Sequence, residues 1–306
     1  MKIEFQSASP FEVPQLFAGD YAEHPVFGEI LLPEGEGTHP AIVAIHGSLN
    51  WSDHHHEHIA GWVEAGFAVF RLHCFDSRRI DDVVADQMRV THTMMLCDAF
   101  AALDLLAEHP QIDAARIGIA GWSLGGMVAL YSAWEPFIEK LSPNRKFAAH
   151  VAFYPAAHLR PDDSRWSDAP IRIYHGSADD YTPIMHVENL IGLLEPKGVD
   201  IRLRTYEDVH HSFDSDKPLT YDPTAIRLDH RTVTIRTNGD LWAEKEPGDW
   251  IRLNTPEERF AAFQYAQNIG CHVKGDAEAK QTCMAEALTD LKEMLDGGPA
   301  QIRTEV

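Results

Sequence analysis

Hydrophobic residues gather in short runs that alternate with amphipathic stretches along most of the chain. Seven runs have the length of β-strands: Val26–Leu32, Ala41–Ile45, Ala68–Leu72, Arg116–Ala120, His150–Tyr154, Ile171–Tyr174 and Ile201–Tyr206. From the second run onward the apolar residues are nearly unbroken, as in parallel strands that are buried on both faces of a sheet. The first run lies between Pro25 and Pro33, which favours an antiparallel strand at the sheet edge.

Helical periodicity fills the segments between these runs. The predicted helices are His55–Ala65, Ala85–Ala107, Leu124–Trp134 and Pro183–Leu194. Gly66 marks the end of the first helix and Pro136 the end of the third. The second carries an apolar stripe at spacings of three and four residues, which we interpret as core packing. Strands that alternate with helices at this spacing predict an α/β fold with a mostly parallel, doubly wound sheet flanked by helices.

The alternation ends after residue 213. The segment 214–255 is polar and rich in Pro and Asp, and it contains a predicted hairpin in which Asn238-Gly239 joins two short strands. These strands are Thr232–Arg236 and Leu241–Glu244, and the helices predicted after them are Glu257–Gln267 and Ala277–Leu295. We therefore divide the chain into a core at 1–213, an insertion at 214–255 and C-terminal helices at 256–306 that complete the core.

A glycine-rich motif follows the fourth predicted strand and precedes a predicted helix. It reads Gly121-Trp122-Ser123-Leu124-Gly125-Gly126. A serine in a G-x-S-x-G pattern between strand and helix occupies a strained turn that lifts its hydroxyl above the sheet. Gly121 and Gly125 leave room for the close backbone approach, and the helix points the positive end of its dipole at the turn. Ser123 is therefore the candidate nucleophile.

A serine hydroxyl is a poor nucleophile unless a base takes its proton and an acid orients that base. The sixth predicted strand is followed by Asp179 and Asp180, and the seventh is followed by His210 and His211. Nucleophile elbows in α/β sheets are followed along the chain by the acid and then by the histidine, as here. The residues themselves leave the choice within each neighbouring pair open.

An oxyanion hole requires two backbone N–H groups that point at the reacting carbonyl oxygen. One is expected from Leu124, which directly follows the candidate nucleophile. The other is expected from the loop after the second predicted strand, which begins His46-Gly47-Ser48. Gly47 permits a tight turn there, and the N–H of Ser48 is the best candidate donor.

These motifs together resemble those of the dienelactone hydrolase family. The stretches that carry the resemblance are His46-Gly47-Ser48, Asp76-Ser77-Arg78, the motif at 121–126, Gly176-Ser177-Ala178-Asp179 with Thr182-Pro183, and His211-Ser212-Phe213. The resemblance implies an α/β-hydrolase fold and a triad of Ser123, Asp179 and His211. It also implies hydrolysis of esters or lactones without a metal or a cofactor. The founding enzymes use a cysteine nucleophile, so a serine here points to a more general carboxylesterase.

The charge balance narrows the range of partners. The chain has 26 Lys and Arg residues against 47 Asp and Glu, a formal net charge of -21. Such a surface repels nucleic acids and anionic membranes, so we expect a small-molecule ester or lactone as partner. No apolar run approaches the ~20 residues of a membrane span. The opening residues also lack the apolar core of a signal peptide, which favours a cytoplasmic location, with a periplasmic or secreted one as the alternative.

Three further residues are candidates for substrate contacts. Arg78 could bind a substrate carboxylate, although an ion pair within the protein is the favoured alternative. Trp51 and Trp122 could shape an acyl pocket, or they could be core residues.

Two other patterns raise the question of a metal site and of a disulfide bond. The stretch 53–58 contains four histidines, of which His54 and His58 form the only i,i+4 pair, and we favour a polar helix start over a metal site. Cys271 and Cys283 are placed so that they could form a local disulfide.

Two other functions are compatible with the sequence. One is a peptidase or amidase with the same triad, and the other is a binding protein without activity. The insertion also allows two interpretations, because a lone hairpin is marginal in water and its apolar residues need a surface to pack on. That surface is either the rim of the active site or a second subunit. We favour the second, which implies a homodimer.

Overall fold

The computed structural model describes residues 1–266 and 268–296. The strands are β1 (Lys2–Ala8), β2 (Glu23–Leu31), β3 (His39–Ile45), β4 (Ala68–Leu72), β5 (Ile112–Trp122), β6 (His150–Phe153), β7 (Leu159–Pro161), β8 (Ile171–Gly176), β9 (Ile201–Tyr206), β10 (Thr220–Ile226), β11 (Val233–Ile235), β12 (Leu241–Glu246), β13 (Asp249–Arg252) and β14 (Ile269–Val273). The helices are α1 (Val13–Ala18), α2 (Asp53–Glu64), α3 (His92–Ala107), α4 (Leu124–Tyr131), α5 (Glu135–Leu141), α6 (Met185–Leu194), α7 (Pro256–Ala266) and α8 (Ala277–Asp296), with 3-10 turns at Asp76–Arg78 and Glu195–Lys197.

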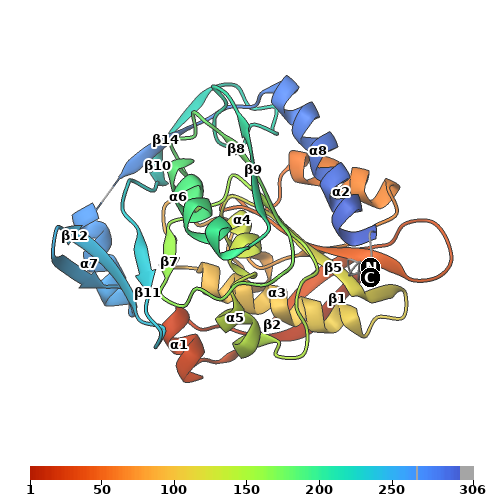
Figure 1. The fold of residues 1–306 in the computed structure, drawn as a ribbon, viewed down its shortest axis with the longest axis horizontal. Coiled ribbons are helices and arrows are strands. Elements are labelled where there is room, and N and C mark those ends of the chain that lie inside the picture. The colour runs from red at the N-terminus through yellow and green to blue at the C-terminus, as the bar shows by residue number, and fades with distance from the viewer. Residues whose placement is uncertain (267, 297–306) are drawn as a thin grey trace, which may run out of the picture.

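Within the described residues the central sheet has eight strands in the order β1-β2-β4-β3-β5-β6-β8-β9. The six strands from β4 to β9 in that order are parallel, and β1 and β2 run antiparallel at one edge. Helices lie on both faces of the sheet, as Figure 1 shows. The predicted mostly parallel, doubly wound sheet is confirmed, and its architecture is that of an α/β-hydrolase.

The buried strands place successive side chains in two separate cores. On β3, Val43 and Ile45 join the core beneath α3, α4 and α6, whereas Ile42 and Ala44 join the core beneath α2 and α8. A fully buried side chain of this size contributes about 1.5–3 kcal/mol. Both faces of the inner parallel strands are therefore apolar, which explains their unbroken apolar runs in the sequence, whereas β9 at the other edge is half-exposed.

The edge of the sheet differs from the prediction in one respect. The strand β2 is antiparallel, as predicted, but it pairs with β4 on one side and with β1 on the other. The edge strand is β1, at Lys2–Ala8, whose alternating residues bury only one face toward α3. A half-exposed strand carries a weaker apolar signal than a buried one, and the sequence analysis missed it.

Two helix boundaries also differ from the prediction. Helix α3 begins at His92, not at Ala85, because the Thr91 side chain caps it by accepting the Met94 N–H at 3.3 Å. Helix α4 ends at Tyr131, and Pro136 lies in the first turn of α5. Proline is favoured at that position because the first N–H groups of a helix have no partner within the helix.

The insertion forms a small sheet on the side of the core. The predicted hairpin is confirmed, since β11 pairs antiparallel with β12 and Ile235 lies opposite Leu241. The sheet has the order β13-β12-β11-β7, so the core segment β7 pairs in parallel with β11. Strand β10 pairs with β14 in a separate ribbon. Figure 1 shows the small sheet and α7 on the side opposite α2 and α8.

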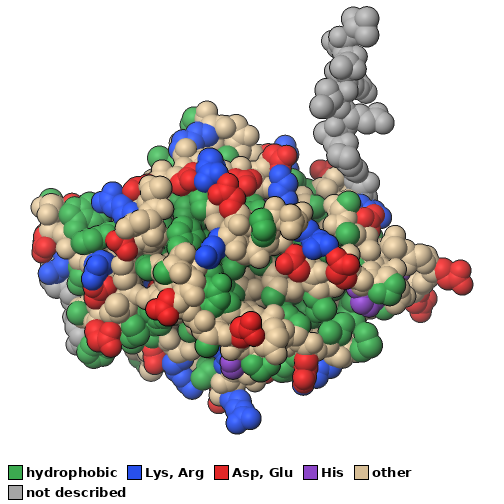
Figure 2. Space-filling model, turned by 90° about the horizontal axis from the view of Figure 1, so that it is seen from below, with side chains coloured by type: hydrophobic (Ala, Val, Ile, Leu, Met, Phe, Trp, Pro, Cys, Tyr) green, Lys and Arg blue, Asp and Glu red, His purple; other side chains and the backbone are tan. Residues whose placement is uncertain are grey.

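All four cysteines are free thiols. The suggested disulfide between Cys271 and Cys283 is absent because the two side chains lie in different apolar clusters. On the face shown in Figure 2, acidic and basic side chains are intermixed with hydrophobic ones. None of the described helices is both long and apolar enough to cross a bilayer.

Candidate active site

Ser123 lies in a tight turn between β5 and α4. Its backbone has φ 55° and ψ -112°, a conformation that non-glycine residues rarely adopt and that costs about 1–3 kcal/mol. A Cβ atom on Gly121 would lie 2.1 Å from the Gly125 carbonyl oxygen, and one on Gly125 would lie 2.3 Å from the Ile45 carbonyl oxygen. Only glycine fits at these two positions. The strained turn is held by a 2.9 Å hydrogen bond from the Ser123 N–H to the Phe153 carbonyl.

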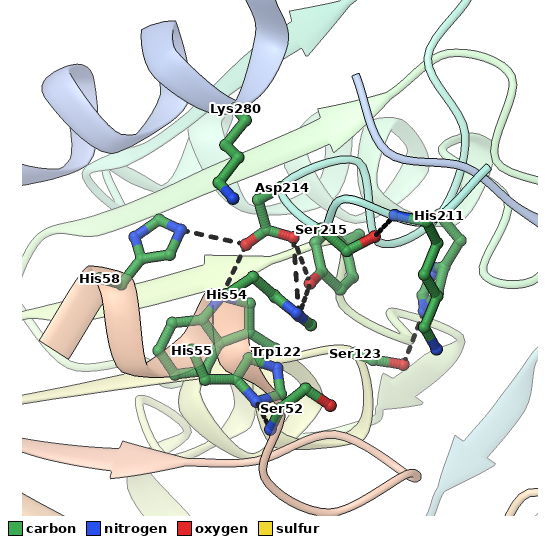
Figure 3. Close-up of polar contacts among 12 residues, drawn as sticks. Ser52, His54, His55, His58, Trp122, Ser123, His211, Asp214, Ser215 and Lys280 are labelled. Carbon is green, nitrogen blue, oxygen red and sulfur yellow. Dashed lines mark hydrogen bonds and ion pairs between the residues drawn. The ribbon is translucent and has the colours of Figure 1, made fainter. Parts of the chain in front are cut away.

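His211 lies on the loop after β9 and bridges the serine and an acid. Its Nε2 is 2.9 Å from Ser123 Oγ, a contact drawn in Figure 3, and its Nδ1 is 2.7 Å from Asp179 Oδ2. Asp179 follows β8, and its Oδ1 accepts the N–H groups of Tyr181 at 2.8 Å and Thr182 at 2.9 Å. The carboxylate is thus fixed by its own loop and faces the imidazole.

The surroundings of Asp179 keep its carboxylate ionised. Burial alone would raise the pKa of Asp179, but His211, His175 and the Thr182 N–H hold it below its ordinary value. Asp179 is therefore ionised at neutral pH. An ionised carboxylate beside Nδ1 keeps the proton on that nitrogen, which leaves Nε2 free to accept the serine proton.

The neighbouring acid and histidine face a different element. Asp180 accepts the backbone N–H of His272 at 2.8 Å and contacts the Nδ1 atom of the same residue at 2.8 Å, on β14. The ring of His210 lies 6.3 Å from that of His272. The structure thus brings Ser123, Asp179 and His211 together and directs Asp180 and His210 away from the serine.

The two candidate oxyanion donors also lie beside Ser123. Ser48 and Leu124 both line the cavity that contains the serine. Among the described residues, neither backbone N–H has a hydrogen-bond acceptor. Gly47 lies against the elbow, where a Cβ atom would be 3.2 Å from the Trp122 carbonyl oxygen. This close approach places the Ser48 backbone next to the serine, and both N–H groups are available for a developing oxyanion.

A cavity of about 230 Å³ opens at Ser123. Its walls come from the core near the elbow, from the insertion and from α7. Apolar side chains on these walls include Leu124, Met127, Leu159, Ile226, Leu228, Val233, Leu241, Ile251 and Leu253. The cavity therefore suits a substrate with a small apolar body.

The insertion is located at the rim of the cavity on its own chain. Ile235 and Leu241 are fully buried and belong to the main core cluster, and Val233 and Ile251 pack against that cluster. Of the two surfaces considered from the sequence, the hairpin packs on the rim of the active site of its own chain, and the homodimer stays a prediction. The preference for the arm overlooked β7, a three-residue strand that gives the hairpin an edge to pair with.

The three residues suggested as substrate contacts do not line the cavity. Arg78 forms a 2.6 Å ion pair with the buried carboxylate of Asp98, so its charge is already neutralised. Trp122 is fully buried behind the elbow, where its side chain faces away from the serine. Trp51 packs on Trp122 with ring centroids 6.3 Å apart. Trp122 is therefore a core residue, and the half-buried Trp51 packs against that core.

A fully buried carboxylate lies behind the triad and was not predicted from the sequence. Asp214 lies three residues after His211, and its Oδ2 accepts hydrogen bonds from Trp122 Nε1 and His58 Nε2, both at 3.0 Å. Its Oδ1 accepts the Tyr154 hydroxyl at 2.8 Å. Figure 3 shows Asp214 between α2 and the elbow. The signal that could have indicated it is the histidine tract, in which His54 and His58 are buried with Nε2 atoms 3.8 and 3.0 Å from this carboxylate.

The histidine tract forms the start of helix α2, as predicted, but three of its four histidines are buried inside the protein. His54, His55 and His58 are all buried on α2. Burial lowers the pKa of His54 and of His55, so both are neutral at pH 7. Burial would raise the pKa of Asp214, but His54, His58 and His55 hold it well below its ordinary value. Within the part of the chain that the structure describes, no cluster of His, Cys, Asp or Glu has a geometry suited to a metal.

We expect Asp214→Ala to lower the free energy of unfolding by about 3–5 kcal/mol, because three buried donors lose their acceptor. The loss should be full above about pH 4, where an unfolded aspartate is ionised. It should shrink as the pH falls toward the lower pKa of the folded protein. Denaturant unfolding at several pH values measures it. The control is Asp216→Ala, which removes an exposed ion pair with Lys280 and should cost less than about 1 kcal/mol. Equal small losses in both variants would contradict this account.

Comparisons with known proteins place the chain in a family. A structure titled as a dienelactone hydrolase-like promiscuous phosphotriesterase, P91 from metagenomic libraries, aligns over 96% of this chain and 98% of its own, with a TM-score of 0.55 and 17% identity. A propionate-bound esterase from Thermogutta terrifontis aligns over 68% of this chain and 85% of its own, with a TM-score of 0.51 and 16% identity. These likenesses concern the fold.

Sequence relatives and a family pattern give the assignment. A probable dipeptidyl-aminopeptidase B of Ajellomyces dermatitidis is 25% identical over 191 residues, which is 54% of this chain and 19% of that protein. This chain thus spans about a fifth of the length of that relative. The sequence pattern of the dienelactone hydrolase family matches residues 28–235, more than half of the chain. The chain therefore belongs to the dienelactone hydrolase family, and it is a hydrolase of the α/β-hydrolase fold.

Proposed function

We propose that the chain is a serine carboxylesterase or lactonase that works through an acyl-enzyme on Ser123. The observation that carries the proposal is the position of His211, whose ring nitrogens lie 2.9 Å from Ser123 Oγ and 2.7 Å from Asp179 Oδ2. Nucleophile, base and orienting acid are then in hydrogen-bond contact, and the nucleophile lies on the wall of the cavity.

The proposed reaction has two half-steps. In the first, His211 Nε2 takes the Ser123 proton as Oγ attacks the carbonyl carbon, and the N–H groups of Leu124 and Ser48 stabilise the oxyanion. His211 then protonates the leaving alcohol, and the acyl group stays on Ser123. In the second half-step, His211 takes a proton from water as the water oxygen attacks the acyl carbonyl. The bond between the acyl carbon and Ser123 Oγ then breaks, His211 returns the proton to Oγ, and the acid is released. Asp179 stays ionised throughout and stabilises the imidazolium.

The size of the cavity bears on the substrate class. About 230 Å³ is less than the ~300–1,000 Å³ usual for drug-sized ligands, so we expect small acyl groups or small lactones. A set of 4-nitrophenyl esters of graded acyl length, small lactones and aminoacyl 4-nitroanilides tests the proposal. Turnover of short-chain esters or lactones with little anilide cleavage is expected.

The same set tests the alternative of a peptidase. That alternative draws support from the sequence relatives described as dipeptidyl-aminopeptidases, which match about half of this chain. A kcat/KM for anilides above that for every ester and lactone would favour it and overturn the proposed ester preference. Absence of any turnover would favour a binding protein.

The insertion gives a separate prediction about selectivity. Replacing residues 215–254 as a whole would remove β10 from β14, so we restrict the change to 237–252, the turn and β12–β13, replaced by a short Gly/Ser linker. Because this segment carries Leu241, Ala243 and Ile251 on the cavity wall, acyl-length preference should shift while the mass in solution stays unchanged. Kinetics with the ester set and light scattering measure the two properties. A changed mass with unchanged selectivity would instead indicate the dimer arm.

A further inference from the structure

A turn at Ser212–Ser215 directly follows the proposed base, His211. It is closed by a 3.0 Å hydrogen bond from the Ser215 N–H to the Ser212 carbonyl. Ser212 has φ 57°, a conformation that non-glycine residues adopt only at a cost in energy. The turn also contains Asp214, whose side chain is fully buried. The contacts of this carboxylate therefore bear on the position of the base.

One oxygen of Asp214 joins this turn to the nucleophile elbow. Its Oδ2 accepts the indole N–H of Trp122, the residue directly before Ser123, at 3.0 Å (Figure 3). The indole of Trp122 is fully buried and stacks on Phe153, with ring centroids 5.0 Å apart. The carboxylate is thus anchored to a closely packed side chain next to the nucleophile.

The other oxygen of Asp214 holds a side chain that packs on the base. The Tyr154 hydroxyl donates to Oδ1 at 2.8 Å, and the Tyr154 ring lies edge-on to His211, with ring centroids 4.6 Å apart. Tyr154 has a strained backbone, with φ 37°, and its carbonyl accepts the Thr182 hydroxyl at 3.1 Å. That hydroxyl lies 3.0 Å from Asp179 Oδ2. Tyr154 therefore contacts both the base and the loop of the orienting acid.

This network acts on the triad and not on the substrate. Asp214, Tyr154 and Trp122 are absent from the wall of the cavity that contains Ser123. Buried hydrogen-bond networks of this kind make a structure rigid. A displacement of 1 Å at a reacting group can cost about a hundredfold in rate. A change in the network should therefore alter the chemical steps and leave substrate binding unchanged.

We propose that Asp214 is a positioning residue for catalysis, which fixes His211 relative to Ser123 through its hydrogen bonds to Tyr154 and Trp122. The proposal rests on the proposed function for the roles of His211 and Ser123. It gives the buried carboxylate a role in the rate of the reaction, in addition to its role in the stability of the fold.

The test removes one hydrogen bond of the network and compares it with a matched loss elsewhere. Tyr154→Phe keeps the ring that packs on His211 and removes only the hydroxyl. The control is Tyr174→Phe, which removes a buried hydroxyl that donates to Asp290 on α8 at 2.6 Å. Asp214→Ala removes the acceptor, and its combination with Tyr154→Phe completes a double-mutant cycle. Thermal unfolding verifies that each variant folds.

Two measurements separate the chemical steps from binding. The first is kcat for 4-nitrophenyl butyrate, which reports on His211 whichever half-step limits the rate, because both half-steps use this base. The second is inactivation by phenylmethanesulfonyl fluoride, corrected for its hydrolysis in buffer. The serine oxygen attacks sulfur, fluoride leaves and the base takes the serine proton, so the rate constant kinact reports on chemistry and the constant KI on binding. Peptide mass spectrometry identifies Ser123 as the modified residue.

Tyr154→Phe should lower kcat and kinact by about three- to tenfold and leave KI within about twofold of wild type. Asp214→Ala should lower both rates by about ten- to hundredfold. Adding Tyr154→Phe to it should change them by less than about twofold, because the hydroxyl has already lost its acceptor. Tyr174→Phe should stay within about twofold of wild type.

Equal losses in the two tyrosine variants, or a change confined to KI, would overturn the proposal. A double variant whose loss is the product of the two single losses would also contradict it, since the two residues would then act independently. If Asp214→Ala does not fold, the comparison of Tyr154→Phe with Tyr174→Phe decides the question alone.

The sulfonyl fluoride separates this proposal from the proposed function. If Ser123 is sulfonylated more slowly in Tyr154→Phe than in Tyr174→Phe, but the wild type hydrolyses no ester or lactone, the proposed function fails and the positioning role stands. If the wild type hydrolyses esters through Ser123 but the two tyrosine variants react alike, only the positioning role fails. A wild type that shows neither sulfonylation of Ser123 nor hydrolysis would overturn both.

Discussion

Replacement of Ser123 by alanine is expected to lower kcat for 4-nitrophenyl butyrate by roughly 10⁴–10⁶, as removal of the nucleophile does in other serine hydrolases. The alanine removes the Oγ that lies 2.9 Å from His211 Nε2 and leaves the surrounding glycines and the helix unchanged. Initial rates at saturating substrate measure the effect.

The control for this variant is its fold. Because the backbone at Ser123 is strained by its φ of 55°, and alanine adopts that conformation no more easily than serine, the melting temperature should change by only a few degrees. A variant that melts like wild type yet retains more than about a tenth of its kcat would remove Ser123 from the mechanism.

The effects of alanine substitutions on kcat/KM are expected to differ sharply between the two neighbouring acids and between the two neighbouring histidines. His211→Ala should lower kcat/KM by roughly 10⁴–10⁶ and Asp179→Ala by roughly 10⁴, because the serine loses its base or the base loses its orientation. Asp180→Ala and His210→Ala should lie within about threefold of wild type, since both side chains face His272 on β14.

Each neighbour is the matched control for its pair, and kcat/KM for one short-chain ester across the four variants is sufficient. The variant Asp179→Asn adds a test of charge. It keeps the shape of the side chain but favours the wrong tautomer of His211, so its kcat/KM should be close to that of Asp179→Ala. If Asp180→Ala or His210→Ala is the more damaging member of its pair, the assignment of the acid or the base is wrong.

The parts of the fold that sequence patterns predicted are those that fill the core. The strand at Ala68–Leu72 matches the structure at both ends because its burial gives a continuous apolar signal. The strand at Ile201–Tyr206 also matches at both ends, although it is a half-exposed edge strand, and the others overlap the observed strands, with β5 longer at both ends than predicted. The edge strand β1 and the three-residue β7 carry little such signal, since their pairing depends on distant segments. The start of α3 depends on a single side-chain cap, which periodicity does not report.

The residues of the candidate site also differ in how well the sequence predicts them. The positions of Ser123, Asp179 and His211 at the ends of strands are local features, and motif order was enough to propose them. Asp214 was missed because its role depends on contacts with residues far away in the sequence, namely the hydrogen bonds that it accepts from His58 and Trp122.

Trapping of the acyl-enzyme tests the central claim most directly. The wild-type protein, mixed with a slowly deacylating 4-nitrophenyl ester and quenched in acid, should gain the mass of one acyl group on the peptide that contains Ser123. The release of 4-nitrophenol should show a burst of about one equivalent per chain. The adduct should be absent from Ser123→Ala and should form far more slowly in His211→Ala. An acyl group on another residue, or ester hydrolysis that persists in Ser123→Ala, would contradict the proposed mechanism.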